Sequence, residues 1–417
     1  MTTAIYWFRN DLRLEDNPSF TQACKAADYL LPVYVHQPSL EKETVWGFPR
    51  LGKHRKVFLD QSLQQLRNQL RELGSDLYEV AGDVLDVFGK LKSQIDVDTI
   101  YCEKIQAPEE LEQEALLRSA GFQMSALWQS SMLDAQSLPF PLEDMPDIFT
   151  QFRQQVEKKK LKFFNPIEAP KSIPPLPTIQ IPPITVADQS TLSNGSKFCG
   201  GERSADAYIE HYFERRLPDT YKQTRNELIG MDYSSKFSPW LAQGCCSAGS
   251  IAKKLSDYEI CYGANDGAYW LWFELLWRDY FRFLHFKYGK RLYYSKGLSK
   301  APSNQFDSEK FLKWSSGHTG ESLIDAGMRE LKNTGYLSNR MRQIVASYWI
   351  YDMQGDWQAG SAWFECQLID YDVYSNQGNW LYIAGKGTDP RGGRPFNVAK
   401  QTQDHDPDGV YRQMWLA

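Results

Sequence analysis

The first 130 residues alternate short apolar runs with segments of helical periodicity, and this alternation constrains the fold more than any other feature. Four runs are rich in β-branched and aromatic residues, as buried parallel strands are: residues 3–8, 29–35, 77–80 and 99–102. Residues 54–73 carry apolar side chains at helical spacing, and Gly74 follows as a C-cap. The alternation predicts a Rossmann-like α/β domain with a doubly wound parallel sheet over residues 1–131.

This α/β half lacks the glycine motifs with which such folds bind nucleotides. It contains neither a G-x-G-x-x-G nor a Walker-type loop. We therefore expect the main cofactor to bind elsewhere in the chain.

The composition changes at residue 132, where prolines begin to punctuate the chain. Ten prolines lie between Pro139 and Pro183. They predict a long Pro-rich connector over residues 132–195, with one short helix near residues 147–159. Beyond it, four segments have a period of 3.6 residues: 204–213, 268–287, 320–332 and 340–353. They predict an all-α C-terminal domain over residues 196–417.

The charge balance and the cysteines exclude several classes of protein. The 47 basic and 52 acidic side chains give a net charge of -5, so a protein that coats duplex DNA through overall positive charge is excluded. Any contact with DNA must use local positive charge. The seven cysteines show no C-x-x-C and no zinc spacing, which indicates reduced thiols and no metal site.

The sequence shows no signal-peptide pattern, and no apolar run approaches the ~20 residues that span a membrane. We therefore expect a cytoplasmic protein, or an organellar or nuclear one in a eukaryote. We also expect a monomer with no membrane partner.

Aromatic residues make up 14% of the chain, and ten of its 13 tryptophans lie between Trp240 and Trp415. Buried aromatic clusters can form a core, carry electrons or surround a flat ligand. Composition alone leaves these three alternatives open.

The segment 269–281, YWLWFELLWRDYF, places charges within an apolar helix. Glu274, Trp277 and Arg278 are neighbours on the helix surface. A carboxylate and a guanidinium in such surroundings are costly unless they are paired or meet a polar ligand. A core helix with an internal ion pair is the alternative.

The segment 232–240, DYSSKFSPW, brings hydroxyl groups to the start of a helical run. Hydroxyls and free backbone N–H groups at such a position form a phosphate cradle. An ordinary N-cap with additional serines would look the same.

Short polar residues occur within an aromatic frame in the segment 368–380, LIDYDVYSNQGNW. Asp370, Asp372 and Asn376 can face one ligand, and Asn339 and Arg342 add a polar pair one helical turn apart. Two aspartates without further ligands are weak support for a metal. With the hydroxyl segment, these residues describe a pocket for a large, flat, phosphorylated cofactor.

Longer stretches follow one another in a recognisable order: YWFRNDLRLEDNPSF, YKQTRN, DYSSKFSPWLAQGC, ELLWRDYFRF, TGYLSNRMRQIVAS and LIDYDVYSNQGNW. They resemble the opening segment and the flavin-binding core of photolyases and cryptochromes. DMPDIFTQFRQQVE, SSKFSPW and NRMRQ resemble the DASH subgroup of cryptochromes.

The resemblance implies one non-covalent FAD in the helical domain. Its phosphates and ribityl chain would be lined by Tyr221, Ser234, Ser235, Lys236, Phe237 and Ser238. Arg278 and Arg342 would flank the cofactor, with Arg342 paired to Asp370. Asp372 would lie near the flavin ring and ribose, and Asn376 beside flavin N5.

The resemblance also implies roles toward a substrate. Glu274 and Asn339 would hydrogen-bond a damaged base pair, and Trp277 would stack on it with Tyr382 on the opposite wall. Trp380, Trp357 and Trp314 would form an electron-hopping chain between the flavin and the surface.

The implied reaction is the blue-light-driven splitting of cyclobutane pyrimidine dimers, preferably in single-stranded DNA. The alternative is a blue-light photoreceptor that acts through a signalling partner and repairs little or nothing. The family's antenna pterin, methenyltetrahydrofolate, contacts an acidic residue after the strand at 99–102. Lys104 takes that place here, with Glu103 adjacent, which indicates an altered antenna site.

Overall fold

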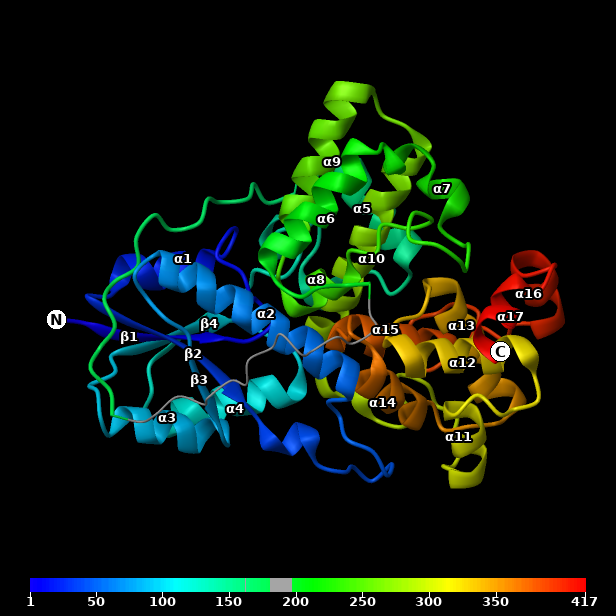
Figure 1. Ribbon diagram of the computed structural model, residues 1–417, viewed down its shortest axis with the longest axis horizontal. Coiled ribbons are helices and arrows are strands. Elements are labelled where there is room, and N and C mark those ends of the chain that lie inside the picture. The colour runs from blue at the N-terminus through cyan, green and yellow to red at the C-terminus, as the bar shows by residue number, and fades with distance from the viewer. Residues whose placement is uncertain (162, 181–196) are drawn as a thin grey trace.

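The computed structural model describes residues 1–161, 163–180 and 197–417. An α/β half at the N-terminal end and a helical half at the C-terminal end pack side by side (Figure 1).

The N-terminal half is built on one sheet of five strands in the order β3-β2-β1-β4-β5, all parallel. The strands are β1 (Thr3–Phe8), β2 (Tyr29–His36), β3 (Tyr78–Ala81), β4 (Thr99–Glu103) and β5 (Met124–Leu127). Its helices are α1 (Pro18–Ala26), α2 (Lys53–Glu72), α3 (Val84–Lys92) and α4 (Pro108–Ser119).

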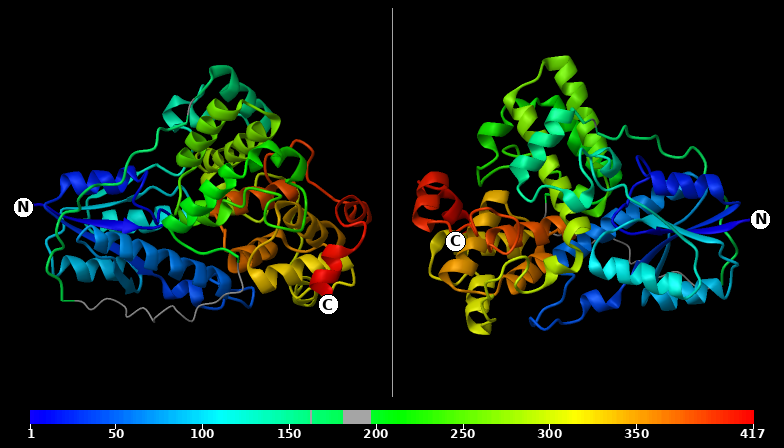
Figure 2. Two further views of the ribbon diagram at one scale, coloured as in Figure 1. Left: turned by 45° about the horizontal axis from the view of Figure 1, so that its top comes forward. Right: turned by 180° about the vertical axis from the view of Figure 1, so that it is seen from behind.

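Alternate residues of β1 point to opposite faces of the sheet, and each face is covered by its own pair of helices. Tyr6 and Phe8 belong to the core that includes α1 and α2, whereas Ile5 and Trp7 pack with α3 and α4. The sheet is therefore covered on both faces, as two further views show (Figure 2). The predicted doubly wound parallel sheet is confirmed.

The connector contributes the helix α5 (Phe149–Lys159), which confirms the short helix expected near residues 147–159. It lies within the helical half, against α10 (Figure 1). Residues 181–195 of the expected connector lie outside the described residues.

The rest of the helical half consists of α6 (Glu202–Glu214), α7 (Tyr221–Thr224), α8 (Ser238–Gln243), α9 (Ala248–Tyr262), α10 (Asp266–Tyr288), α11 (Ser308–Ser315), α12 (Ser322–Thr334), α13 (Asn339–Ser347), α14 (Trp357–Gln367), α15 (Val373–Ile383), α16 (Val398–His405) and α17 (Val410–Leu416). The four helices expected from periodicity are α6, α10, α12 and α13. However, α13 ends at Ser347 and continues as a π-helical turn over Tyr348–Asp352.

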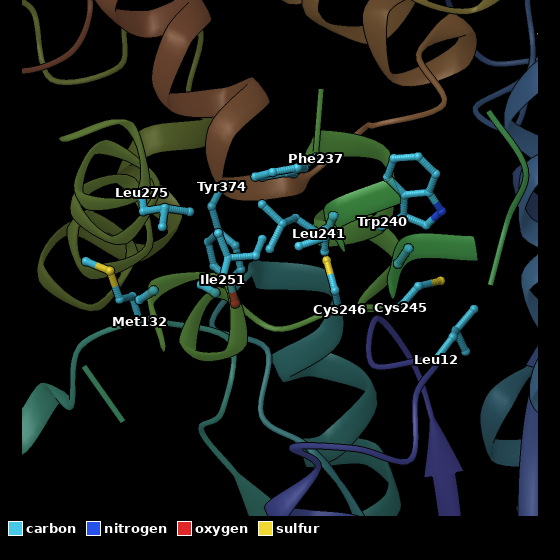
Figure 3. Packing of buried hydrophobic residues seen from close by; sticks show 14 of the residues in the cluster. Leu12, Met132, Phe237, Trp240, Leu241, Cys245, Cys246, Ile251, Leu275 and Tyr374 are labelled. Carbon is cyan, nitrogen blue, oxygen red and sulfur yellow. The ribbon is translucent and has the colours of Figure 1, made fainter. Parts of the chain in front are cut away.

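One hydrophobic core runs through both halves. Figure 3 shows Leu12, which follows β1, beside Cys245, in the same cluster as Cys246 and as Trp240 and Leu241 of α8. The two halves therefore share buried apolar surface.

Polar contacts fix this junction as well. The carboxylate of Glu202, at the start of α6, accepts hydrogen bonds from the backbone N–H groups of Leu14 and Glu15, both at 2.9 Å. Arg13 donates to the carbonyl oxygen of Gly244 at 3.0 Å. A Cβ atom at Gly244 would lie 1.9 Å from the carbonyl oxygen of Asn10, so only glycine permits this approach.

We expect Gly244→Ala to destabilise the chain more than Gly74→Ala. Both glycines have positive φ, +67° and +77°, so each substitution carries left-handed strain of about 1–2 kcal/mol. Only at Gly244 does the new methyl group collide with the other half, which should cost a further ~1–3 kcal/mol. Urea unfolding midpoints measure the difference. Equal midpoints would show that the approach of Asn10 contributes nothing.

Candidate functional site

A cavity of about 80 Å³ lies in the helical half. Six of the residues singled out from the sequence line it: Asn339, Arg342, Asp370, Asp372, Asn376 and Trp380. Eight further lining residues were not anticipated: Gln343, Ala346, Phe364, Leu368, Tyr371, Ser375, Asn379 and Ile383. Several of these stand one turn from an anticipated residue on α13 or α15, which is the signal that could have identified them.

Arg342 and Asp370 form an ion pair in the cavity wall. Arg342 Nη2 lies 2.7 Å from Asp370 Oδ2, so the expected pairing is confirmed. Asp370 Oδ1 is buried and has no hydrogen-bond partner among the described residues. A buried carboxylate oxygen without a donor is unusual in a folded protein. It is therefore free to accept a hydrogen bond from a ligand N–H or O–H group.

Asp372 is held by Arg282, which the sequence did not single out. Arg282 Nη2 lies 2.6 Å from Asp372 Oδ2, and Asp372 also caps α15 by accepting from the N–H of Ser375 at 2.8 Å. Burial would raise the pKa of Asp372, but the guanidiniums of Arg282 and then Arg278 lower it to about 2. The cavity wall therefore keeps a charged carboxylate here. Arg282 follows Arg278 by one turn of an apolar helix, and this spacing is the sequence signal that could have identified Arg282.

Asn376 lies one turn into α15 and lines two cavities, the one just described and a wider one between the two halves. Its amide nitrogen donates to Ser361 O at 3.1 Å and to Ser361 Oγ at 2.9 Å. These two bonds fix the plane of the amide, so its oxygen has a defined direction.

The segment that precedes α8 lies outside the cavity wall. Ser234, Ser235 and Ser238 are partly exposed, and their hydroxyls bond to no other described residue. Lys236 is 4% exposed with φ +50°, and burial lowers its pKa to about 7. Lys236 and Arg342 both lie over the ring of Tyr336, at 5.1 and 5.3 Å, so this segment adjoins the cavity.

Tyr221 and Arg278 are likewise absent from the cavity wall. Tyr221 is buried at the start of α7. Arg278 donates to the carbonyl oxygens of Ser130 and Leu241 and thereby ties the segment just before the connector to α8. The guanidinium of Arg278 nevertheless lowers the pKa of Asp372 in the cavity wall, and the role of Arg278 beside the cofactor stays a prediction.

Glu274 and Arg225 form an ion pair on α10 and the segment after α7. The guanidinium of Arg225 also lies 4.3 Å from the ring centre of Trp270. Burial raises the pKa of Glu274, and Arg225 opposes that shift. Arg225 belongs to the stretch YKQTRN, in which only Tyr221 was singled out.

Trp277 and Tyr382 do not face each other across a gap, contrary to expectation. Their rings meet edge-on at 5.6 Å and 77°. One face of Trp277 is stacked on Phe149 of α5 at 3.6 Å and 12°. Arg394 donates to the Tyr382 hydroxyl at 2.6 Å, which fixes the tyrosine from its polar end.

The three tryptophans expected to carry electrons are all buried. Trp380 and Trp357 are 2% and 3% exposed, and Trp314 is 0% exposed. Trp314 therefore cannot be the surface end of a chain, because α11 turns it into the core. Trp357 lines the wider cavity and donates to the carbonyl oxygen of Ser295 at 2.8 Å.

The wider cavity has a volume of about 560 Å³ and opens beyond the carboxyl ends of β1, β2 and β4. The strand order reverses between β1 and β4, which is where open α/β sheets bind ligands. At its edge, Arg50 lies 2.8 Å from a carboxylate oxygen of Glu109 and 2.9 Å from one of Glu365. Glu109 and Glu110 line this cavity, whereas Lys104 lies over the ring of Phe286 at 5.6 Å.

In the described ranges, no group of three or more His, Cys, Asp or Glu side chains is arranged to hold a metal ion. The helices of the same ranges include none with the length and apolarity needed to span a membrane.

Two family models match the chain. Residues 4–175 match DNA photolyase, and residues 270–417 match the FAD binding domain of DNA photolyase. Cryptochrome DASH of Idiomarina loihiensis is 42% identical over 99% of this chain and 92% of its own length. Cryptochrome DASH, chloroplastic/mitochondrial, of Arabidopsis thaliana is 39% identical over 99% of this chain and 75% of its own.

Two solved structures share the fold. The cryptochrome of Synechocystis sp. PCC6803 superposes with a TM-score of 0.94 at 41% identity, over 100% of this chain and 89% of its own. A class III photolyase from Agrobacterium tumefaciens gives 0.84 at 26% identity, over 100% and 86%. The chain therefore belongs to the photolyase/cryptochrome family, in its DASH cryptochrome subgroup.

Proposed function

We propose that this chain binds one FAD in the helical half and uses it to split cyclobutane pyrimidine dimers in DNA under blue light. The observation that carries the proposal is the cavity wall, where the buried Asp370 keeps an unpartnered carboxylate oxygen beside the half-buried guanidinium of Arg342. That arrangement suits a ligand with ring N–H or ribityl O–H groups. FAD would supply the light absorption and the transferable electron.

Two sets of residues would hold the cofactor. Asn339, Arg342, Asp370, Asp372 and Asn376 line the cavity and would meet the ring and sugar. The phosphates would lie against the adjoining segment, with Tyr221, Ser234, Ser235, Lys236, Phe237 and Ser238. The unbonded hydroxyls and the buried ammonium of Lys236 support this second assignment.

The substrate side of the site would be formed by Glu274, Trp277, Asn339 and Tyr382. The Glu274 carboxyl, whose pKa is raised by burial, would hydrogen-bond a base carbonyl and stabilise negative charge on the dimer. Trp277, which is partly exposed and held by Phe149, would stack on the dimer. The two carbon–carbon bonds of the cyclobutane ring break and the electron returns, so the overall reaction is redox-neutral.

Trp380 would be the first electron donor, because it lines the cavity. Trp314 and Trp357 would be further carriers within the helical half.

The cavity between the halves would bind an antenna chromophore such as methenyltetrahydrofolate. Its position at the reversal of strand order and the carboxylates of Glu109 and Glu110 in its wall support this assignment. Asn376 belongs to both cavities, so an antenna there would lie close to the FAD.

Blue-light repair by the purified chain tests the proposed reaction. FAD is identified by its absorbance, which also reveals a second chromophore, and is then reduced before illumination with dimer-containing oligonucleotide. We expect Glu274→Ala to lower the dimers split per absorbed photon by about tenfold or more, because a hydrogen bond to a charged group contributes ~1.5–3 kcal/mol. Asp266→Asn, an exposed change on the same helix, should leave the yield unchanged. If the unmodified chain with fully reduced FAD splits no dimers, a photoreceptor function is favoured instead.

Single-stranded DNA should be the better substrate. A dimer must leave the base stack to enter the site, which costs a few kcal/mol in a duplex and much less in a single strand. The contact of Arg394 with Tyr382 makes this side of the site polar, and a polar site suits a lesion that is already unpaired. Repair rates on the same oligonucleotide, with and without its complement, measure this preference. Equal rates on both substrates contradict it.

The affinity for FAD should fall as the pH rises above 7. Burial lowers the pKa of Lys236 to about 7, so the free protein loses this charge in mildly basic solution. A bound phosphate favours the charged form, and binding then requires proton uptake, at a cost of up to about tenfold in affinity per pH unit. Titration of the apoprotein with FAD between pH 6 and 9 measures this slope. The variant Lys236→Met should bind FAD more weakly, with an affinity that does not change with pH. The control Lys222→Met should keep the pH dependence of the unmodified chain. If the affinity of the unmodified chain does not change with pH, Lys236 does not contact the phosphates.

A further inference from the structure

A row of aromatic rings runs along α10 from the proposed substrate side toward the start of the helix. Trp270 and Phe273 precede Trp277 by seven and four residues, so the three side chains share one stripe of the helix surface. The ring centres of Trp270 and Phe273 are 4.5 Å apart. Phe149 joins this pair to Trp277, with its ring centre 5.1 Å from that of Phe273 and 3.6 Å from that of Trp277. Of the three rings on α10, only Trp277 has a part in the proposed reaction.

The row on α10 is open to solvent. Trp270, Phe273 and Trp277 are each partly exposed, whereas Leu271 and Leu275 on the other side of the helix are buried. Large rings that served only the core would be buried with those leucines. Partly exposed aromatic rings beside a binding site are typical of a surface that a partner covers. The row therefore offers a contact surface that continues from Trp277.

Two guanidinium groups accompany the rings. Arg225 lies 4.3 Å from the ring centre of Trp270, and Arg153 lies 5.6 Å from that of Phe273. Arg153 belongs to α5 and Arg225 follows α7, and both of these helices pack on α10 (Figure 1). Arg153 Nε also lies 3.9 Å from Glu157 Oε2. Positive charge is therefore available on both sides of the row.

A third guanidinium, that of Arg340 at the start of α13, forms no ion pair with any described residue. Its Nη2 donates to Asn226 Oδ1 at 3.0 Å, and its Nε is buried without a hydrogen-bond partner among the same residues. Burial, and after it the charge of Arg225, lower the pKa of Arg340. The two guanidiniums therefore repel each other, and Glu274 balances only one of them. A phosphate group between them would relieve that repulsion.

Unpaired bases with their phosphates fit this surface. Every base has a flat face that stacks on an aromatic side chain, and such stacking tolerates any sequence. In a duplex the neighbouring base pairs already cover these faces, whereas a single strand leaves them free. The phosphates of the same strand are the anions that guanidiniums attract. The surface therefore favours single-stranded over double-stranded DNA.

The spacing of the rings suits a strand that is anchored by its dimer. Trp270 and Trp277 are seven residues apart on one helix, which is ~10 Å along its axis. At the ~3.4 Å advance per nucleotide of a stacked strand, this distance corresponds to about three nucleotides. A dimer at Trp277 thus brings the nucleotides beside it over the row.

We propose that the unpaired bases beside the dimer stack on Trp270 and Phe273, and that this surface selects single-stranded DNA. A phosphate of the same strand lies between Arg225 and Arg340. The inference rests on the proposed function, because the dimer at Trp277 anchors the strand. Binding forms and breaks no covalent bond.

Binding in the dark of an oligonucleotide with one dimer, measured with and without its complementary strand, tests the surface. We expect Trp270→Ala to weaken binding of the single strand by about 5- to 150-fold, because one base stack is lost. Binding of the duplex should change by less than about twofold, because its bases are already stacked. Phe273→Ala should act in the same direction, and Trp270→Phe, which keeps a ring, should lose less. Trp272→Ala is the matched control, because this partly exposed tryptophan lies about 200° around the same helix from Trp270.

Melting temperature and FAD content show whether each variant is folded. Crosslinking of the unmodified chain to a 5-bromouracil placed next to the dimer needs no variant, and a crosslink to Trp270 or Phe273 supports the surface. If both alanine variants bind the single strand as Trp272→Ala does, or if crosslinks form only elsewhere, the surface is not used. Equal weakening for single strand and duplex would show that Trp270 does not select by stacking. If the unmodified chain with fully reduced FAD splits no dimers, the proposed function is overturned instead.

Discussion

The ion pair between Arg282 and Asp372 joins the two helices on which the candidate site depends. Arg282 belongs to α10, and Asp372 caps the start of α15. Because both groups are buried, the pair stabilises only as a unit, and loss of one partner typically costs ~3–5 kcal/mol. This cost fixes the register of α15 against α10. Three residues of the candidate site, Asn376, Trp380 and Tyr382, lie further along α15, so the register of α15 sets their positions.

The same helix α10 connects the site to the rest of the chain. The fully buried carboxylate of Asp279 accepts from the N–H groups of Met132 and Leu133, at 2.9 and 2.8 Å, at the start of the connector. Arg278 holds the carbonyls of Ser130 and Leu241. The connector helix α5 then places Phe149 on the ring of Trp277. The connector is therefore a structural part of the proposed substrate side, rather than only a link between the halves.

Local sequence patterns predicted most of the helices and strands. Features that depend on contacts between residues far apart in the chain were missed. The β1 run and the long α10 period are local signals, and both elements form where expected. The β5 run, MSAL, is only partly buried and lacks a continuous apolar signal, so it was missed. The depth of Trp314 and the partners of Arg278 are set by residues 31 or more positions away, which no local pattern encodes. For the same reason the sequence identified only some of the polar residues of the cavity, and it overlooked Gln343, Ser375 and Asn379 as well as most of the apolar wall.

The pair of Arg225 and Glu274 shows how the site balances charge before a substrate enters. An isolated carboxylate on so apolar a helix would be costly, and Arg225 removes much of that cost. The guanidinium has a second partner in the ring of Trp270, so it can leave the carboxylate without losing all of its contacts. A DNA strand offers phosphates that compete for the same guanidinium. Release of Arg225 would remove the charge that opposes the effect of burial, so the pKa of the half-buried Glu274 carboxyl would rise further. Strand binding and activation of the carboxyl would thus be two consequences of one ion-pair exchange.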